Sequence, residues 1–255
     1  METGLLDHLP LWTILPLTVA VALLAVEAGF RFARYRQQRS AEEKEAALGG
    51  MVGATLGLLA FMLAFTFGLA GARFEDRREV VLSEANAIGT TYLRGAMLPE
   101  PMGTEARNLL REYVDVRLEG VRENKVDQAI IKSEELHERL WSVAVAATQK
   151  ERSPTTNLFV ISLNEVIDLH ATRLMRVRSR VPGVIWIVLY VLAILAMVMI
   201  GYQQGLSGDK RSLAVIALVI GFSTVLYLIT DLDRPGQGML QVSQQAMTDL
   251  RRSMK

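Results

Sequence analysis

The chain has 255 residues, 51% of them hydrophobic, and its formal net charge is +1. A near-neutral charge balance argues against a nucleic-acid partner, which would need a strongly basic surface. No cysteine is present, so disulfides, thiol nucleophiles and cysteine-ligated metals are excluded.

Two long apolar runs lie near the start of the chain and two more lie near its end. Their only charged residue is Glu27, and the runs cover residues 11–30, 48–72, 184–202 and 212–230. Each approaches the ~20 residues that a helix needs to cross ~30 Å of hydrocarbon. Lipid cannot satisfy free backbone groups, so such spans must be helices. The sequence therefore predicts an all-α polytopic membrane protein with four transmembrane helices.

Residues 73–182, between the second and third spans, are polar and mix charges of both signs. They contain no β-strand alternation and have helical periodicity. Span two should continue into this segment as one long helix, since no proline interrupts it before Pro99. This predicts a helical extramembrane domain between residues 1–72, which hold two spans, and residues 183–230, which hold the other two.

Capping residues predict where the later helices of this domain begin. Thr104 and Ser133 precede apolar positions at helical spacing and are candidate N-caps. Ser153 and Pro154 open a last helix, because proline is tolerated in a first turn. That helix should end near Arg180.

Residues 231–255 form a C-terminal tail. Pro235, Gly236 and Gly238 follow span four directly and predict a turn there.

Charge does not decide the orientation of the chain in the membrane. The loop after span one is basic while the N-terminus has no Lys or Arg, which by the positive-inside rule places the large domain outside. An opposing set of arginines flanks the other side of the spans: Arg73, Arg77, Arg78, Arg173, Arg176, Arg178, Arg180 and Arg234.

One face of span two carries the most distinctive pattern in the chain. Glycines at four-residue spacing allow close helix approach in lipid, and the same slowly winding face continues with aromatic and then acidic residues. The residues are Gly49, Gly53, Gly57, Phe61, Phe65, Asp76 and Glu79. Several copies turned toward one axis would form a hydrophobic constriction with an acidic vestibule, which favours cations. The alternative is ordinary helix packing with the phenylalanines against lipid.

The patterns around the other notable polar residues predict structural roles rather than catalysis or ligand binding. Glu27 lies one turn before Arg31, which predicts an interfacial ion pair. His170 shares an apolar helix face with Phe159, Leu163 and Val166, which is typical of a hydrogen-bonded core residue. No motif indicates catalysis, a metal or a cofactor, so an enzyme is not expected.

Three segments resemble the bestrophins, in particular the bacterial bestrophin-like proteins. The run LAFMLAFTFGLAGARFEDRREVVLSEANAIGTTYLR is similar to the bestrophin second span, with Phe61 and Phe65 at pore-neck positions followed by Arg73-Phe74. LNEVIDLHATRL resembles the stretch before span three. DLDRPGQGMLQVSQQ resembles the signature of the bacterial family.

The resemblance implies a pentameric ion channel in the bacterial inner membrane, with the helical layer and both termini in the cytosol and small ions as the permeant species. Gly57 stands where many bestrophins carry a third bulky neck residue, which predicts a shorter constriction. The calcium-binding acidic run of animal bestrophins is not matched by Asp231 and Asp233. The alternative function is a non-conducting oligomeric scaffold or sensor whose helical layer binds a partner.

Overall fold

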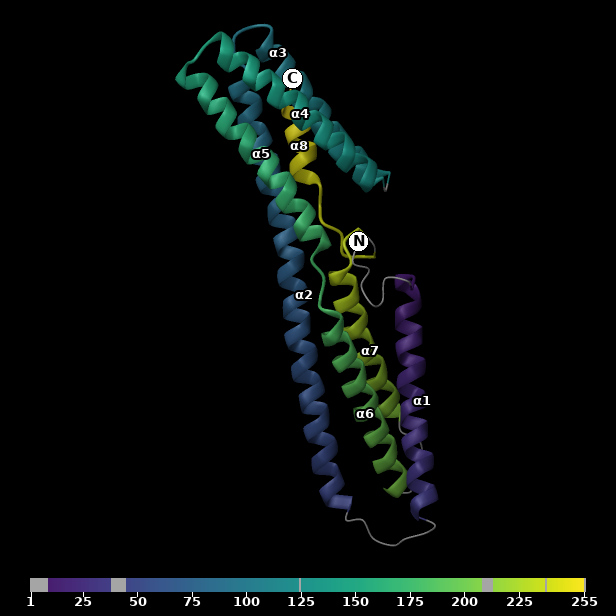
Figure 1. Ribbon diagram of the computed structural model, residues 1–255. Helices are drawn as coiled ribbons and strands as arrows, with labels where there is room; N and C mark the ends of the chain where they lie inside the picture. The colour runs from purple at the N-terminus through teal and green to yellow at the C-terminus, as the bar shows by residue number, and fades with distance from the viewer. Residues whose placement is uncertain (1–8, 38–44, 124, 208–212, 237, 255) are drawn as a thin grey trace. The chain divides into compact units, whose positions relative to one another are not determined.

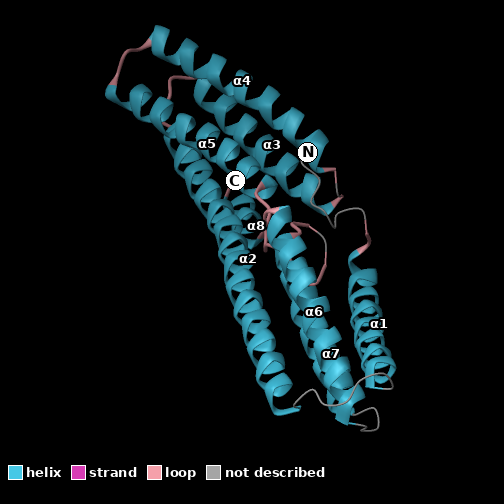
Figure 2. Cartoon of the chain, turned by 60° about the horizontal axis from the view of Figure 1, so that its bottom comes forward, coloured by secondary structure: helices cyan, strands magenta, loops and turns pink. Residues whose placement is uncertain are grey.

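The computed structural model describes residues 9–37, 45–123, 125–207, 213–236 and 238–254. These residues form helices joined by short loops and contain no strand (Figure 2). Four helices are long and apolar enough to cross a membrane, which confirms the predicted fold class. The chain divides into two compact units, residues 1–74 with 179–240 and residues 75–178 with 241–255.

The first unit holds the membrane-spanning segments. It comprises α1 (Leu11–Gln37), the first part of α2 (Glu45–Gly95), α6 (Gly183–Ser207) and α7 (Leu213–Asp233) (Figure 1). Apolar side chains of α2, α6 and α7 form one core, among them Leu59, Leu63, Trp186, Leu189, Leu226 and Ile229. A second core joins Ala25 of α1 to Met197 and Ile200 of α6.

Glycines bring α1 and α6 into direct backbone contact. A Cβ at Gly201 would overlap the carbonyl oxygen of Val26, and one at Gly29 would overlap the carbonyl oxygen of Val198. One turn further on, a Cβ at Gly205 would lie 2.7 Å from the carbonyl oxygen of Phe30. Helix association in lipid depends on van der Waals contact, so small residues of this kind set how closely two spans approach.

The second unit is extramembrane in composition and is built around a large apolar core. It comprises the rest of α2, then α3 (Met102–Arg122), α4 (Val126–Lys150), α5 (Pro154–Arg178) and the short α8 (Gln245–Ser253). Its largest fully buried side chains are Tyr113, Phe159, Ile88, Leu110, Leu136, Leu140 and Leu163. The amphipathic pattern of α3 and α4 buries one face of each helix in this core.

Two predicted helix starts are wrong and one is confirmed. Helix α3 begins at Met102, and the Thr104 hydroxyl bonds the Glu100 side chain at 3.0 Å instead of capping the helix. Helix α4 begins at Val126, so Ser133 lies inside it and donates to the Ala129 carbonyl. Serine and threonine hydroxyls can bond nearby polar groups inside a helix as well as at its cap, so these residue types alone do not fix a helix start. Helix α5 begins at Pro154, after Ser153, as predicted.

The C-terminal tail turns as predicted and then forms a helix that the sequence analysis did not anticipate. Gly236 and Gly238 have φ values of 77° and 96°, which favour glycine. Within the second unit, α8 places Met247 in the core, and Arg251 forms two bonds of 2.6 and 3.0 Å to Asp115.

Candidate functional site

The predicted neck residues lie on a face of α2 that the other described residues leave exposed. Phe61 and Phe65 are 67% and 61% exposed, while Leu59, Leu63 and Thr66 on the opposite face are buried. Both rings are therefore free to meet lipid, another copy of the chain or the wall of an axial pore. The pore neck therefore stays a prediction.

The glycines before the neck make no close contact within one chain. A Cβ at Gly53 or Gly57 would meet none of the described atoms within 4 Å, and one at Gly49 would reach only the Gln203 side chain at 3.5 Å. Their predicted role in helix packing therefore concerns contacts between copies and stays a prediction. Among the described glycines of the four spans, those whose added Cβ would overlap another helix lie on α1 and α6 instead.

The two predicted vestibule acids have different surroundings. Asp76 forms an ion pair with Arg176 of α5, both in the extramembrane unit. Glu79, one turn further along α2, is exposed and forms no ion pair with the described residues. The pairing lowers the negative field that Asp76 can contribute, so Glu79 is the stronger candidate for attracting cations.

A buried ionic network joins three helices of the extramembrane unit. Glu84 of α2 is fully buried and lies 2.5 Å from Arg173 of α5 and 3.3 Å from Arg117 of α3. Tyr113 donates its hydroxyl to Glu84 at 2.7 Å. Arg173 also donates to the Gln244 amide oxygen at 3.0 Å. One carboxylate thus faces two guanidinium groups, and their positive charges favour the ionised form of Glu84 in this core.

Electrostatics keep this network ionised and its histidines neutral. Burial raises the pKa of Glu84, but Arg173 and Arg117 outweigh it, so the net pKa is lowered. Burial and the nearby Glu84 charge raise the pKa of Tyr113 well above its usual range. Burial lowers the pKa of His170 to about 4, with Arg117 adding to the effect.

The bonds of Tyr113 determine the tautomer of His170. Because the Tyr113 hydroxyl donates to Glu84, its oxygen is free to accept from His170 Nδ1, 3.2 Å away. This confirms His170 as a hydrogen-bonded core residue. The His137 ring packs edge-on against it with centroids 4.9 Å apart. The network therefore links α2, α3 and α5 through buried polar contacts within the extramembrane unit.

Two carboxylates at the start of the DLDRPGQGMLQVSQQ segment accept hydrogen bonds from the backbone around them. Asp231 is fully buried and accepts backbone N–H bonds from Met239 and Leu240 at 3.1 to 3.3 Å. Asp233 accepts the backbone N–H of Val181 at 2.8 Å. These two acids therefore hold the turn and the start of span three.

In α1, Arg31 pairs with Glu27 at 2.8 Å, which confirms the predicted ion pair; its place at the membrane interface stays a prediction.

A model of the Bestrophin-like domain matches residues 17–247. The chain belongs to the Bestrophin-like family. The match covers both units of this bestrophin-like protein and includes the neck positions, the Glu84 network and the signature turn. The resemblance noted in the sequence is therefore confirmed at the level of the family.

Solved structures share the fold of this bestrophin-like protein at low sequence identity. A bacterial bestrophin homologue from Klebsiella pneumoniae is 15% identical, with a TM-score of 0.66 over 95% of this chain and 96% of that chain. A point variant of that homologue gives a TM-score of 0.67 at 14% identity, over 96% and 97% of the two chains. No curated protein sequence matches the chain.

Sequence reasoning did not find the buried network of this bestrophin-like protein. Glu84, Arg117 and Arg173 are far apart along the chain, and each stands among other charged residues. The one available signal is position, since each lies on the face of its helix that also carries buried apolar residues.

Proposed function

We propose that this protein is a homo-oligomeric ion channel, with α2 lining an axial pore. Support comes from the family together with the exposed Phe61 and Phe65, which point away from the packed face of α2. Bulky apolar rings around a narrow axis gate ions by excluding water. The pentameric state, the inner membrane and a cytosolic helical layer form part of the proposal and rest on the resemblance to bestrophins.

The neck is tested by ion flux into liposomes. Replacing Phe61 and Phe65 together with alanine should raise flux by about tenfold or more, because a wider and wetter constriction lowers the barrier to ions. Phe67 is a matched control: it is a 43% exposed phenylalanine of the same span on a different face. Phe67→Ala should leave flux unchanged. Two results would favour the non-conducting scaffold: the same flux in the wild type and all variants, or no flux in any of them although each assembles as an oligomer.

We further propose a weak cation preference set by Glu79. Repeated around an oligomer, this exposed acid forms a ring of negative charge that concentrates cations. Arg176→Gln should strengthen the preference, since it frees Asp76 from its ion pair. Glu79→Gln should weaken it.

Reversal potentials in asymmetric sodium chloride measure both effects on selectivity. Arg178→Gln is the control for Arg176→Gln. Arg178 is an exposed arginine of the same helix, α5, and forms no ion pair with the described residues. A reversal near the chloride potential in the wild-type protein would show that these acids do not set selectivity.

A further inference from the structure

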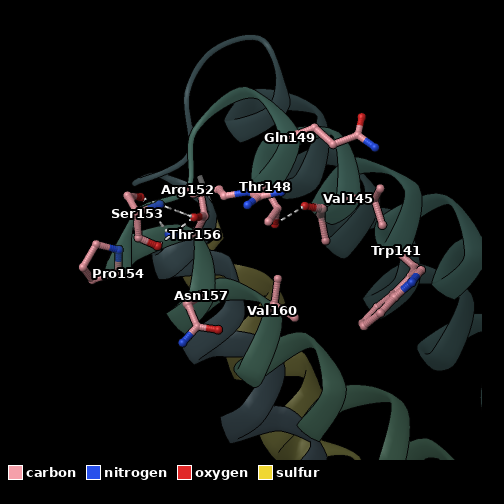
Figure 3. A pocket seen from close by; sticks show the side chains of 11 residues that line it. Trp141, Val145, Thr148, Gln149, Arg152, Ser153, Pro154, Thr156, Asn157 and Val160 are labelled. Carbon is pink, nitrogen blue, oxygen red and sulfur yellow. Dashed lines mark hydrogen bonds between the residues drawn. The ribbon is translucent and has the colours of Figure 1, made fainter.

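A pocket opens between α4 and α5 at the end of the extramembrane unit, away from the buried network. Its volume is about 630 Å³, within the range of roughly 300–1,000 Å³ that is common for small-molecule sites. In Figure 3 helix α4 lines one side and α5 the other, and the connecting residues 152–154 close one end. All lining residues belong to one unit of one chain.

The wall of the pocket is apolar and contains one aromatic ring. Trp141 and Val145 are 41% and 43% exposed, and they lie on α4 opposite Val160 of α5 (Figure 3). Ala144 of α4 also lines the pocket. An exposed tryptophan beside aliphatic side chains offers a flat surface on which a ring can stack. The wall therefore suits a planar apolar body.

The rim of the pocket carries a single charge. Among the lining residues Arg152 is the only ionisable one, and the others are apolar or neutral polar. Arg152 is exposed and forms no ion pair or side-chain hydrogen bond with the described residues. Asn157, also at the rim, adds an amide. A free guanidinium presents several N–H donors in a plane that matches a carboxylate.

We propose that this pocket binds a small amphipathic anion, with a flat apolar body against Trp141 and a carboxylate or sulfonate on Arg152. The size, the apolar wall and the single positive charge of the pocket all select this chemistry over a cation or a neutral polar molecule. The inference does not depend on ion conduction, so a flux result cannot decide it.

The test uses the full-length protein in lipid nanodiscs with 4-nitrobenzoate as the probe and neutral 4-nitrobenzamide as its isostere. Nitroaromatic rings quench tryptophan fluorescence. The difference in quenching between the wild-type protein and Trp141→Phe is the signal from the pocket. We expect saturable quenching by nitrobenzoate, with an affinity about tenfold tighter than for nitrobenzamide, as one charge-assisted pair provides.

Arg152→Gln should remove the difference between the two probes, and Asn157→Asp should weaken nitrobenzoate alone. Arg139→Gln is the matched control, because Arg139 is an exposed arginine of α4 that pairs with Glu112 and does not line the pocket. Thermal unfolding checks that each variant is folded. Quenching that never saturates, or that is equal for both probes, would overturn the proposal. Shielding of Trp141 from both probes would also overturn it, since another copy would then fill the pocket.

Discussion

The two units of this protein hold their helices together in different ways. In the membrane-spanning unit the buried clusters are apolar, and Gly29, Gly201 and Gly205 let α1 and α6 touch through their backbones. In the extramembrane unit a large apolar core surrounds one buried carboxylate and two guanidinium groups. Burial from water supplies little attraction between helices that already lie in lipid, so close fit matters most there.

In the extramembrane unit, burial of apolar surface contributes more than close backbone packing. Its core is stabilised by removing apolar surface from water, and the Glu84 network adds a requirement that three helices meet in one arrangement. The comparison predicts that the two units fail through different substitutions. The extramembrane unit should be most sensitive to loss of a charge, and the spanning unit to added volume.

The largest expected effect is the loss of the Glu84 charge. Glu84→Gln should destabilise the extramembrane unit by about 3–5 kcal/mol, because it leaves two buried guanidinium groups without a counter-charge. The measurement is the midpoint of unfolding in detergent, with circular dichroism as the signal that reports helix loss. The matched control is Glu79→Gln on the exposed face of the same helix, which should change stability by less than about 0.5 kcal/mol. Equal effects of the two substitutions would contradict a structural role for the network.

A smaller effect is expected from added volume in the spanning unit. Gly201→Ala should cost about 1–3 kcal/mol, because its Cβ has no room beside the Val26 carbonyl. Gly53→Ala should leave the fold of one chain unchanged, since that Cβ meets no described atom. Thermal unfolding separates the two. If Gly53 packs between copies as predicted, Gly53→Leu should instead weaken the oligomer in size-exclusion chromatography.

The smallest effect at neutral pH concerns His137 and His170. The pKa of each is lowered from 6.5 to about 4, mainly by burial; Arg117 contributes to this lowering and Glu84 opposes it. The unfolded chain therefore binds protons first as the pH falls. The stability that the neutral rings contribute is complete above about pH 6.5 and is lost progressively down to about pH 4.

Unfolding midpoints between pH 7.5 and 4.5 measure this loss. His137→Phe should reduce the slope, since it removes one titrating ring and keeps an aromatic contact with Tyr113 and His170. A slope unchanged by this substitution would assign the acid sensitivity to other groups.

Local features of the sequence determined the secondary structure of most of the chain. The length and apolar content of four runs were sufficient to predict four spans, since a bilayer admits few alternatives. The absence of proline before Pro99 predicted that span two continues beyond the membrane as one helix, which the structure ends at Gly95, and the glycines after span four predicted the turn. Ser153 and Pro154 marked the start of α5 because their preference is local.

Only the tertiary structure decided which residues meet. Glu84 contacts Arg117 and Arg173 from other helices, and Gly201 of α6 faces Val26 of α1 rather than a glycine of span two. Helix α8 is short and polar, and it is held by Met247 in the core and by the pair of Arg251 with Asp115. Periodicity reports which face of a helix is apolar. It does not report the partner of that face, because the partner is set by packing between segments far apart in the chain.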